Sequence, residues 1–272
     1  MIHILVSTYN GEKYLEEQLD SLLKQEGVEY EIIVRDDGST DTTCNILSKW
    51  GESKKLRWFS GKNIGVKDSF LDLLSKAPDN GYYAFCDQDD YWFKNKMFLS
   101  LEKMKECECS YPDKPIIVHT DMNVVDQNLK ILYPSFWKIS KFRPEILNTF
   151  NNLAACNGLN GCTMMLNNQA RKLILEKKIS QNVVIHDVLC SLIVSANGGI
   201  IDYVNEPTMY YRQHSLNVVG VKPYSFFDKF KKIKNIKRVV EDNLAFWRVL
   251  NQVGRISIWQ YVYRKIYYYI IR

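Results

Sequence analysis

The first 120 residues alternate short apolar runs with stretches in which apolar residues recur at helical spacing. The apolar runs predict strands at residues 2–7, 31–35, 56–59, 82–86 and 116–120, and the helical spacing predicts helices over 12–24, 41–50, 66–76 and 94–106. Strands that alternate with helices of this length indicate βαβ units and a mainly parallel central sheet flanked by helices. The sequence therefore predicts an α/β fold.

Beyond residue 120 the alternation is less regular. We predict a strand over 161–166, helices over 168–177 and 186–196, and two short strands over 199–204 and 208–211. No internal repeat or low-complexity linker separates these elements. We therefore expect one α/β domain at residues 1–219, followed by a C-terminal extension at 220–272.

Polar residues follow four of the predicted strands, at the point where each strand ends. The runs are Ser7-Thr8-Tyr9-Asn10-Gly11, Asp36-Asp37-Gly38-Ser39-Thr40-Asp41, Lys62-Asn63-Ile64-Gly65 and Asp87-Gln88-Asp89-Asp90. Ligand sites in parallel α/β sheets form outside the carboxyl ends of the strands. These runs therefore mark the expected site.

The acidic run at residues 87–90 is the central feature of that site. Three carboxylates within four residues repel one another unless a positive charge lies among them. Hard cations such as Mg²⁺ or Mn²⁺ take carboxylate and phosphate oxygens as ligands. The run therefore indicates a metal that bridges to a diphosphate, and the competing interpretation is a solvated acidic turn that caps the next helix.

Composition narrows the class of protein. A 46% hydrophobic and 25% charged chain is typical of a globular protein and excludes a disordered one. Its seven cysteines are scattered without a CxxC pair, which favours reduced thiols in the cytoplasm over a disulfide framework or a zinc site. We find neither a secretory signal nor a spanning segment, so the expected location is cytoplasmic.

The net charge of +5 is unevenly distributed. From Gly220 onward the chain carries twelve Lys/Arg, three Asp/Glu and twelve aromatic residues, which leaves the first 219 residues weakly acidic. Basic residues between Lys229 and Arg238 alternate with Phe226, Phe227, Phe230, Ile233 and Ile236. A basic amphipathic helix with aromatics suits the inner face of an anionic membrane. A helical arm that packs on this chain or on a second subunit is the alternative, and nucleic acid is not expected because no recognition motif accompanies the charge.

Three motifs together carry a family resemblance. Val6-Ser7-Thr8-Tyr9-Asn10, Arg35-Asp36-Asp37-Gly38-Ser39-Thr40-Asp41 and the Asp-x-Asp motif at 87–89 resemble glycosyltransferase family 2, which has the GT-A nucleotide-sugar-binding fold. Phe85–Trp92, His186-Asp187 and Tyr211-Arg212-Gln213-His214 resemble its bacterial rhamnosyltransferase-like branch, which builds capsule, O-antigen or wall polysaccharide. The resemblance covers residues 1–219 and implies an inverting, metal-dependent transferase with a nucleotide-sugar donor.

The resemblance also implies roles for single residues on the donor side. Thr8, Tyr9, Asn10, Asp36 and Asp37 would surround the base of a dTDP- or UDP-linked donor, and Lys62 and Asn63 would lie near the nucleotide. Asp87 would contact the ribose, while Asp89 and His214 would hold Mn²⁺ or Mg²⁺, with Asp90 as a second candidate ligand. The imidazole mildly favours manganese. Arg212 would pair with phosphate or act as an ordinary surface arginine.

On the acceptor side, Asp187 matches the catalytic-base position of the family. An aspartate within hydrogen-bond reach of the acceptor hydroxyl suffices as the base, although the same residue could simply cap a helix. Many relatives have Glu-Asp here, so His186 is a departure. Trp92 would stack on a sugar or belong to the core, and Asn160 and Gly161 would line the acceptor, an expected lipid-linked glycan. The alternatives to a rhamnosyltransferase are a galactosyl-, glucosyl- or N-acetylhexosaminyltransferase and a non-catalytic binding module. Oligomerisation stays open.

Overall fold

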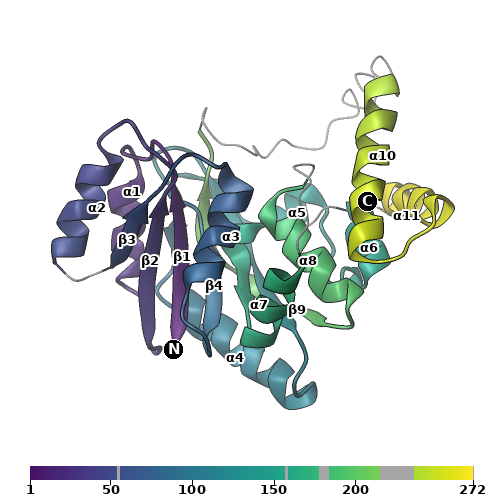
Figure 1. Cartoon of the computed structure of the whole chain (residues 1–272), viewed down its shortest axis with the longest axis horizontal. Helices are drawn as coiled ribbons and strands as arrows, with labels where there is room; N and C mark the ends of the chain where they lie inside the picture. Colours follow the sequence, from purple (N-terminus) through teal and green to yellow (C-terminus); the bar gives the residue numbers. More distant parts are fainter. Residues whose placement is uncertain (54–55, 157–158, 178–183, 215–235, 272) are drawn as a thin grey trace.

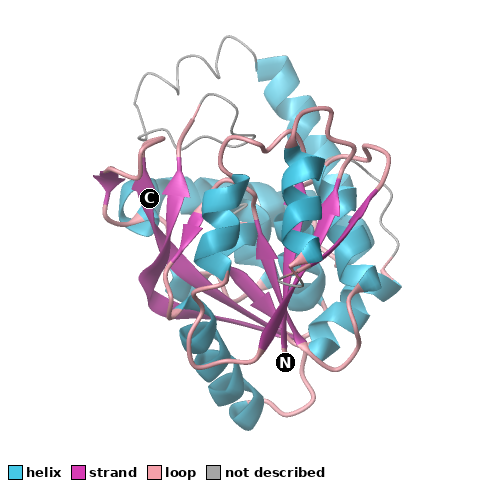
Figure 2. Ribbon diagram, turned by 90° about the vertical axis from the view of Figure 1, so that its left-hand side faces the viewer, coloured by secondary structure: helices cyan, strands magenta, loops and turns pink. Residues whose placement is uncertain are grey.

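The computed structural model describes residues 1–53, 56–156, 159–177, 184–214 and 236–271. A nine-stranded sheet runs through it in the order β3-β2-β1-β4-β8-β6-β9-β5, with β7 paired to β6, and helices cover both of its faces (Figures 1 and 2). The strands are β1 Ile2–Thr8, β2 Tyr30–Asp36, β3 Arg57–Ser60, β4 Tyr82–Cys86, β5 Tyr91–Trp92, β6 Ile116–Val125, β7 Ile131–Tyr133, β8 Met164–Leu166 and β9 Ile200–Arg212.

The helices alternate with these strands in the first half of the chain and gather in the second. They are α1 Leu15–Leu22, α2 Thr43–Glu52, α3 Val66–Lys76, α4 Lys96–Ser110, α5 Phe136–Ser140, α6 Phe150–Cys156, α7 Asn168–Glu176, α8 His186–Ala196, α10 Ile236–Val253 and α11 Ile258–Ile271. Short 3₁₀ turns occupy Pro144–Ile146 and Gly161–Thr163. The predicted α/β class is confirmed, and α3 and α8 have the predicted bounds.

The four strands β3, β2, β1 and β4 are parallel, as the sequence predicts. Ile4, Leu5 and Val6 of β1 are fully buried because helices cover both faces of the sheet. Each of these strands ends at the same edge, and the polar runs that follow them therefore meet there.

The second half of the sheet departs from the prediction. β8 lies antiparallel between β4 and β6, whereas β6 and β9 pair in parallel, so the second half of the sheet is mixed. The two strands predicted over 199–204 and 208–211 are one continuous strand, β9. Its register against β6 shifts between Thr120, opposite Val204, and Asp121, opposite Pro207. This bulge takes up the polar residues that interrupt the apolar pattern.

Apolar side chains form one cluster on each face of the sheet. One cluster joins α1, α2 and α4 to the sheet, and the other joins α3, α6, α7, α8, α10 and α11 to it. Helices α10 and α11 thus share the second core. Val249 and Leu250 are fully buried there, and a Cβ at Gly254 would lie 2.9 Å from both Ala196 and Phe150.

Helices α10 and α11 therefore pack on the rest of this chain, which is the arrangement that the sequence analysis left open as the alternative to membrane contact. The predicted boundary at Gly220 and most of the basic segment between Phe226 and Ile236 lie outside the described residues, and both stay predictions. Among the helices in the described ranges, none combines the length and the apolar character needed to cross a membrane.

Candidate active site

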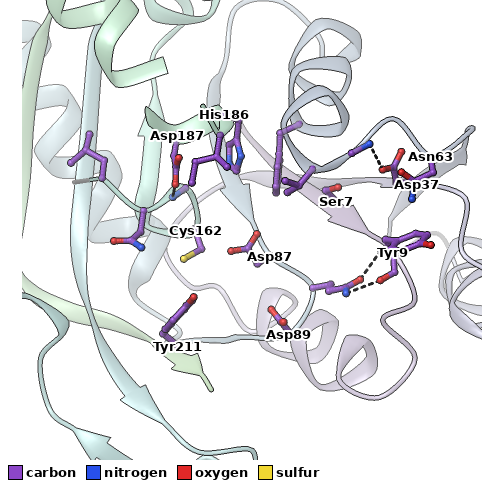
Figure 3. A pocket seen from close by; sticks show the side chains of 18 residues that line it. Ser7, Tyr9, Asp37, Asn63, Asp87, Asp89, Cys162, His186, Asp187 and Tyr211 are labelled. Carbon is purple, nitrogen blue, oxygen red and sulfur yellow. Dashed lines mark hydrogen bonds between the residues drawn. The ribbon is translucent and has the colours of Figure 1, made fainter. Parts of the chain in front are cut away.

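A cleft of about 470 Å³ opens at the carboxyl ends of β1, β2 and β4, where Figure 3 shows its lining side chains. It is also reached by α8 and by the turn at Gly161–Thr163. Nine of the residues expected from the sequence line it: Tyr9, Asp37, Asn63, Asp87, Asp89, Asn160, Gly161, His186 and Asp187. The strand-end runs and the later His-Asp pair therefore belong to a single cavity.

Asp37 is fixed at one end of the cleft by the neighbouring loop and by Arg35. Its carboxylate accepts the backbone N–H groups of Ile64 and Gly65 at 2.8 and 2.9 Å, and Arg35 Nη1 donates to it at 2.5 Å. Arg35 also donates to the carbonyl of Lys62 at 3.1 Å. Gly38 lies close to this loop with φ +80°, a conformation that suits glycine. The arrangement holds Asn63 and Asp37 side by side at the rim.

Tyr9 lines the cleft near Asp37 and Asn63, and 48% of its surface is exposed (Figure 3). Its backbone N–H donates to Gln88 Oε1 at 2.8 Å, and Gln88 Nε2 donates back to the Tyr9 carbonyl at 3.0 Å (Figure 3). Gln88 therefore ties the β1 loop to the acidic run. The sequence interpretation treated Gln88 only as the middle residue of the Asp-x-Asp motif.

Four residues predicted to surround the nucleotide do not line the cleft. Asp36 is fully buried and accepts hydrogen bonds from Ser39 and Thr8, among others; these lower its pKa although burial opposes the shift. Thr8 is likewise buried. Asn10 adopts φ +47°, and its side chain accepts the Thr40 N–H. Lys62 contributes its carbonyl to Arg35 and points no side-chain atom into the cavity lining. These residues shape the loops around the cleft, and their direct contact with the nucleotide stays a prediction.

Asp87 lies at the centre of the cleft in an environment that disfavours a negative charge. Burial, followed by the charges of Asp89 and Asp187, raises its pKa to about 7, and a hydrogen bond with Cys162 partly offsets that rise. Asp90 is fully buried: Oδ1 accepts the Arg212 N–H at 3.1 Å, and Oδ2 has no hydrogen-bond partner within the described ranges. Burial raises the pKa of Asp90 well above its usual value. The Asp90 carboxylate is therefore less accessible to a metal ion than the Asp89 carboxylate.

The two predicted metal ligands are in direct contact. His214 Nε2 lies 2.8 Å from Asp89 Oδ2, and the two side chains are 8% and 17% exposed. A carboxylate oxygen and an imidazole nitrogen are ligands that Mn²⁺ accepts. Beside them lies Asp87, whose pKa is raised first by burial and then by the charges of Asp89 and Asp187, and a divalent cation would relieve the repulsion among these carboxylates. The residues present therefore fit a divalent metal at this end of the cleft.

Asp187 lies in the first turn of α8, across the cleft from the Asp-x-Asp motif. Its carboxylate accepts the backbone N–H groups of Gly161 at 3.0 Å and of Val188 at 2.6 Å. Burial is the largest effect on it and raises its pKa to about 6, although these hydrogen bonds favour the charged form. A carboxylate fixed in this way and with this pKa can accept a proton near neutral pH.

His186 lines the cleft next to Asp187. Its ring stacks on Phe70 with centroids 4.1 Å apart and meets Phe85 edge to face at 5.0 Å. Burial lowers its pKa to about 3, so the imidazole is neutral. Both ring nitrogens are buried, and neither has a hydrogen-bond partner in the part of the chain that the structure describes. Gly161 makes room for this ring, since a Cβ there would lie 2.3 Å from Nε2.

Two further residues lie away from the cavity lining, and for Trp92 this agrees with the core role that the sequence analysis left open. Arg212 is 1% exposed; its guanidinium donates to the carbonyls of Asp89 at 2.8 Å and Gln127 at 2.7 Å and pairs with Glu17. It supports the Asp89 loop from behind and does not line the cavity. Trp92 is 1% exposed and belongs to the core beneath α1 and α4, which removes it from the acceptor side.

The cavity also contains residues that the sequence did not single out. Cys162 lies within 4.8 Å of the carboxylates of Asp87 and Asp90. An apolar group consisting of Val66, Phe70, Leu159 and Ile185 forms part of the lining. Apolar residues at helix starts and in loops look like ordinary core positions in a sequence, which is why these four were not predicted.

A cleft at the carboxyl ends of parallel strands is the usual ligand-binding position of an α/β protein. A profile described as Glycosyl transferase family 2 matches residues 3–165. The chain is also 31% identical over 245 residues to the "dTDP-rhamnosyl transferase RfbG" of Shigella flexneri, with 84% of this chain and 78% of that protein covered. The chain belongs to glycosyltransferase family 2 and is a transferase.

Solved structures share the fold. S. aureus TarS, residues 1–349, in complex with UDP-GlcNAc matches 97% of this chain and 79% of that chain with a TM-score of 0.58 and 19% identity. The mannosyltransferase PcManGT of Pyrobaculum calidifontis, in complex with GDP-Man and Mn²⁺, matches 97% of this chain and 73% of that chain with a TM-score of 0.54 and 15% identity. At these identities the likeness confirms the GT-A fold.

Proposed function

We propose that this glycosyltransferase inverts the anomeric centre as it moves rhamnose from a nucleoside-diphosphate donor to a hydroxyl of a polysaccharide or lipid-linked glycan of the bacterial surface. The observation that carries the proposal is the presence of Asp187 and the Asp89–His214 pair in and beside one cleft. One group can accept a proton from an attacking hydroxyl, and the other can hold the cation of a leaving diphosphate.

Asp187 is the proposed base. Inversion requires the hydroxyl to attack from the face opposite the leaving group, and Asp187 comes from α8 while the metal pair comes from the β4 loop and the segment after β9. The Gly161 and Val188 N–H groups hold its carboxylate in one orientation. With a pKa of about 6 it is deprotonated at neutral pH and still basic enough to take the proton.

Asp89 and His214 are the proposed metal ligands, with manganese favoured over magnesium because imidazole prefers the softer ion. When bound, the cation supplies Lewis-acid stabilisation of the charge that develops on the diphosphate. Asp87 would lie beside the ribose, with Tyr9, Asp37 and Asn63 around the base. A thymine or uracil N3–H could donate to the Asp37 carboxylate, so dTDP and UDP donors both fit.

Rhamnose is favoured by two observations. The relative from Shigella flexneri is named for dTDP-rhamnosyl transfer. The apolar lining from Val66, Phe70, Leu159 and Ile185 suits the methyl group that a 6-deoxyhexose carries where other hexoses carry a hydroxymethyl group. His186 would bind a sugar hydroxyl next to the base, since its buried neutral ring offers one donor and one acceptor. Asn160 and Gly161 would lie on the acceptor side.

Donor hydrolysis by the purified protein tests the proposal. The panel contains dTDP-rhamnose, UDP-galactose, UDP-glucose and UDP-N-acetylglucosamine with Mn²⁺, alongside an EDTA control and Asp187→Asn. We expect hydrolysis of dTDP-rhamnose that depends on metal and on Asp187. Turnover of a UDP-sugar instead would overturn the sugar assignment alone. No turnover of any donor, together with no calorimetric binding of dTDP or UDP in Mn²⁺, would contradict the assigned chemistry.

A further inference from the structure

Helix α11 is apolar on both of its faces. Tyr261 and Tyr268 point inward and are 2% and 7% exposed. On the opposite face five large apolar or aromatic side chains are exposed: Trp259 at 80%, Tyr263 at 64%, Ile266 at 55%, Tyr267 at 44% and Val262 at 39%. Their spacing of three and four residues places them on one stripe. We call this stripe the outer face of α11.

The helix is held firmly enough for this face to be a fixed feature. The Tyr261 hydroxyl donates to Asn243 Oδ1 at 2.8 Å, and Lys265 Nζ donates to the same oxygen at 2.5 Å. Arg264 Nη1 donates to Asn152 Oδ1 at 3.3 Å, which joins α11 to α6. On the outer face, Tyr263 and Tyr267 stack with centroids 6.4 Å apart. The inner contacts therefore leave the aromatic stripe turned away from the body, and Figure 1 shows α11 at the margin of the molecule.

The charged residues around this stripe indicate which kind of partner surface it complements. Residues 243–272 contain five Lys/Arg and no Asp or Glu. The exposed Arg255 precedes α11, while Arg264 and Lys265 flank the stripe. Aromatic side chains with cations beside them complement the interface of an anionic bilayer, where Trp and Tyr rings lie at the headgroup level.

We infer that the outer face of α11 is a docking surface for an anionic lipid bilayer, with α11 lying in the plane of the interface. Its 14 residues are too few to span a bilayer, which needs about 20. The inference is independent of the sugar that the enzyme transfers, because it rests on a surface outside the cleft.

Vesicle flotation of the full-length protein tests the inference. We expect the wild-type protein to float with phosphatidylcholine vesicles that contain phosphatidylglycerol and to float much less with phosphatidylcholine alone. Raising the ionic strength from about 0.1 M to about 1 M shortens the Debye length from about 10 Å to about 3 Å and should weaken binding. The triple variant Trp259→Ser, Tyr263→Ser, Ile266→Ser should lower the partition coefficient by at least ~10-fold, because binding scales with buried apolar area.

Phe98→Ser with Tyr111→Ser serves as a matched control, since both side chains are exposed, at 43% and 47%, but lie elsewhere. This control should bind like the wild type. Trp259→Phe should keep binding but lose the blue shift of tryptophan fluorescence that vesicles induce. Unchanged melting temperature and donor hydrolysis in solution would show that the triple variant is folded.

Equal flotation of the triple variant and the wild type, or no flotation of the wild type, would overturn the inference. Light scattering after size-exclusion chromatography tests whether the outer face binds a second copy of the chain instead. A wild-type dimer that the triple substitution converts to a monomer, without an effect of vesicles, would assign the outer face to a second copy of the chain and would equally overturn it.

Discussion

His214 Nε2 lies 2.8 Å from Asp89 Oδ2 although 125 positions separate the two residues in the chain. The contact exists because β9 pairs with β6 and ends beside the β4 loop, where Arg212 donates to the Asp89 carbonyl. The two halves of the sheet thus meet at this pair.

Removing either ligand should abolish most metal-dependent activity. For Asp89→Asn and His214→Ala we expect kcat to fall by roughly 100- to 1,000-fold, because a bound cation contributes several kcal/mol to the stabilisation of developing charge. Steady-state kinetics over a Mn²⁺ titration would measure the loss together with the shift in the metal concentration at half activity. Asp113→Asn, at an exposed position in the turn between α4 and β6, is the control. Wild-type kinetics in His214→Ala would remove His214 from the metal site.

Asp187 should set the acidic limb of the pH profile. The base works deprotonated, and the pKa of Asp187 is raised to about 6, so kcat/KM should rise as the pH passes through about 6 and then level off. Asp187→Asn should lower kcat about 10²- to 10⁴-fold and leave nucleotide binding unchanged. Asp20→Asn, at an exposed position of α1, is the matched control. An acidic limb that persists in the residual activity of Asp187→Asn would assign the ionisation to another group.

The same raised pKa affects stability with a definite sign. The folded protein binds the Asp187 proton more tightly than the unfolded chain, so this group stabilises the fold at low pH, and the contribution is lost as the pH rises from about 4 through about 6. Asp187→Asn should therefore raise the free energy of unfolding at pH 8 by up to about 3 kcal/mol. Urea titrations at pH 5 and pH 8 would measure it. A variant that is less stable than the wild type at pH 8 contradicts the assignment.

His186 offers a test of hydrogen bonding without a change in packing. His186→Phe keeps a flat ring between Phe70 and Phe85 but removes both nitrogens, and we expect kcat/KM to fall about 10- to 100-fold, which corresponds to one buried hydrogen bond. His186→Gln restores a donor and an acceptor and should recover part of the loss. Since burial lowers the pKa of His186 to about 3, neither substitution should move the pH profile above pH 5. Full activity in His186→Phe would leave the ring with a packing role only.

Arg212 should act through the metal pair and not through the donor phosphates. Arg212→Lys cannot reproduce the contacts to the carbonyls of Asp89 and Gln127, so we expect a loss of about 1–3 kcal/mol in the free energy of unfolding and a lower kcat that excess Mn²⁺ partly restores. Arg143→Lys, in a half-exposed pair with Glu145, should change stability by less than about 0.5 kcal/mol. If Arg212→Lys raised only the KM of the donor, a phosphate contact would be the better explanation.

The sequence predicted the edge of the sheet at which the site forms, because the carboxyl ends of parallel strands meet there. It could not predict which of two adjacent acids faces the cleft. Asp36 ends β2 and turns inward to Ser39 and Thr8, whereas Asp37 is turned outward by Arg35 and the N–H groups of Ile64 and Gly65. Neighbouring side chains on a strand point to opposite faces, and the loop that follows decides between them.

Contacts across the second half of the sheet were harder to predict. The antiparallel insertion of β8 and the bulge in β9 depend on pairings between distant segments, which local hydrophobic periodicity does not encode. For the same reason Trp92 could not be separated from an exposed aromatic. Its ring is buried in the cluster to which α1 and α4 contribute, and α1 reaches it from a distant part of the chain.

A divalent cation held by Asp89 and His214 would also stabilise the folded state against unfolding. A cation bound by both residues would cross-link two points of the chain that lie 125 positions apart. In the unfolded chain the same cross-link would require these points to be brought together at a cost in conformational entropy. Ligand that binds only the native state adds about 2.7 kcal/mol at one hundred times its dissociation constant. If Asp89 and His214 hold a divalent cation as proposed, the melting temperature of the protein should rise with the concentration of that cation, and the supply of the ion would then affect how long the folded enzyme persists as well as how fast it works.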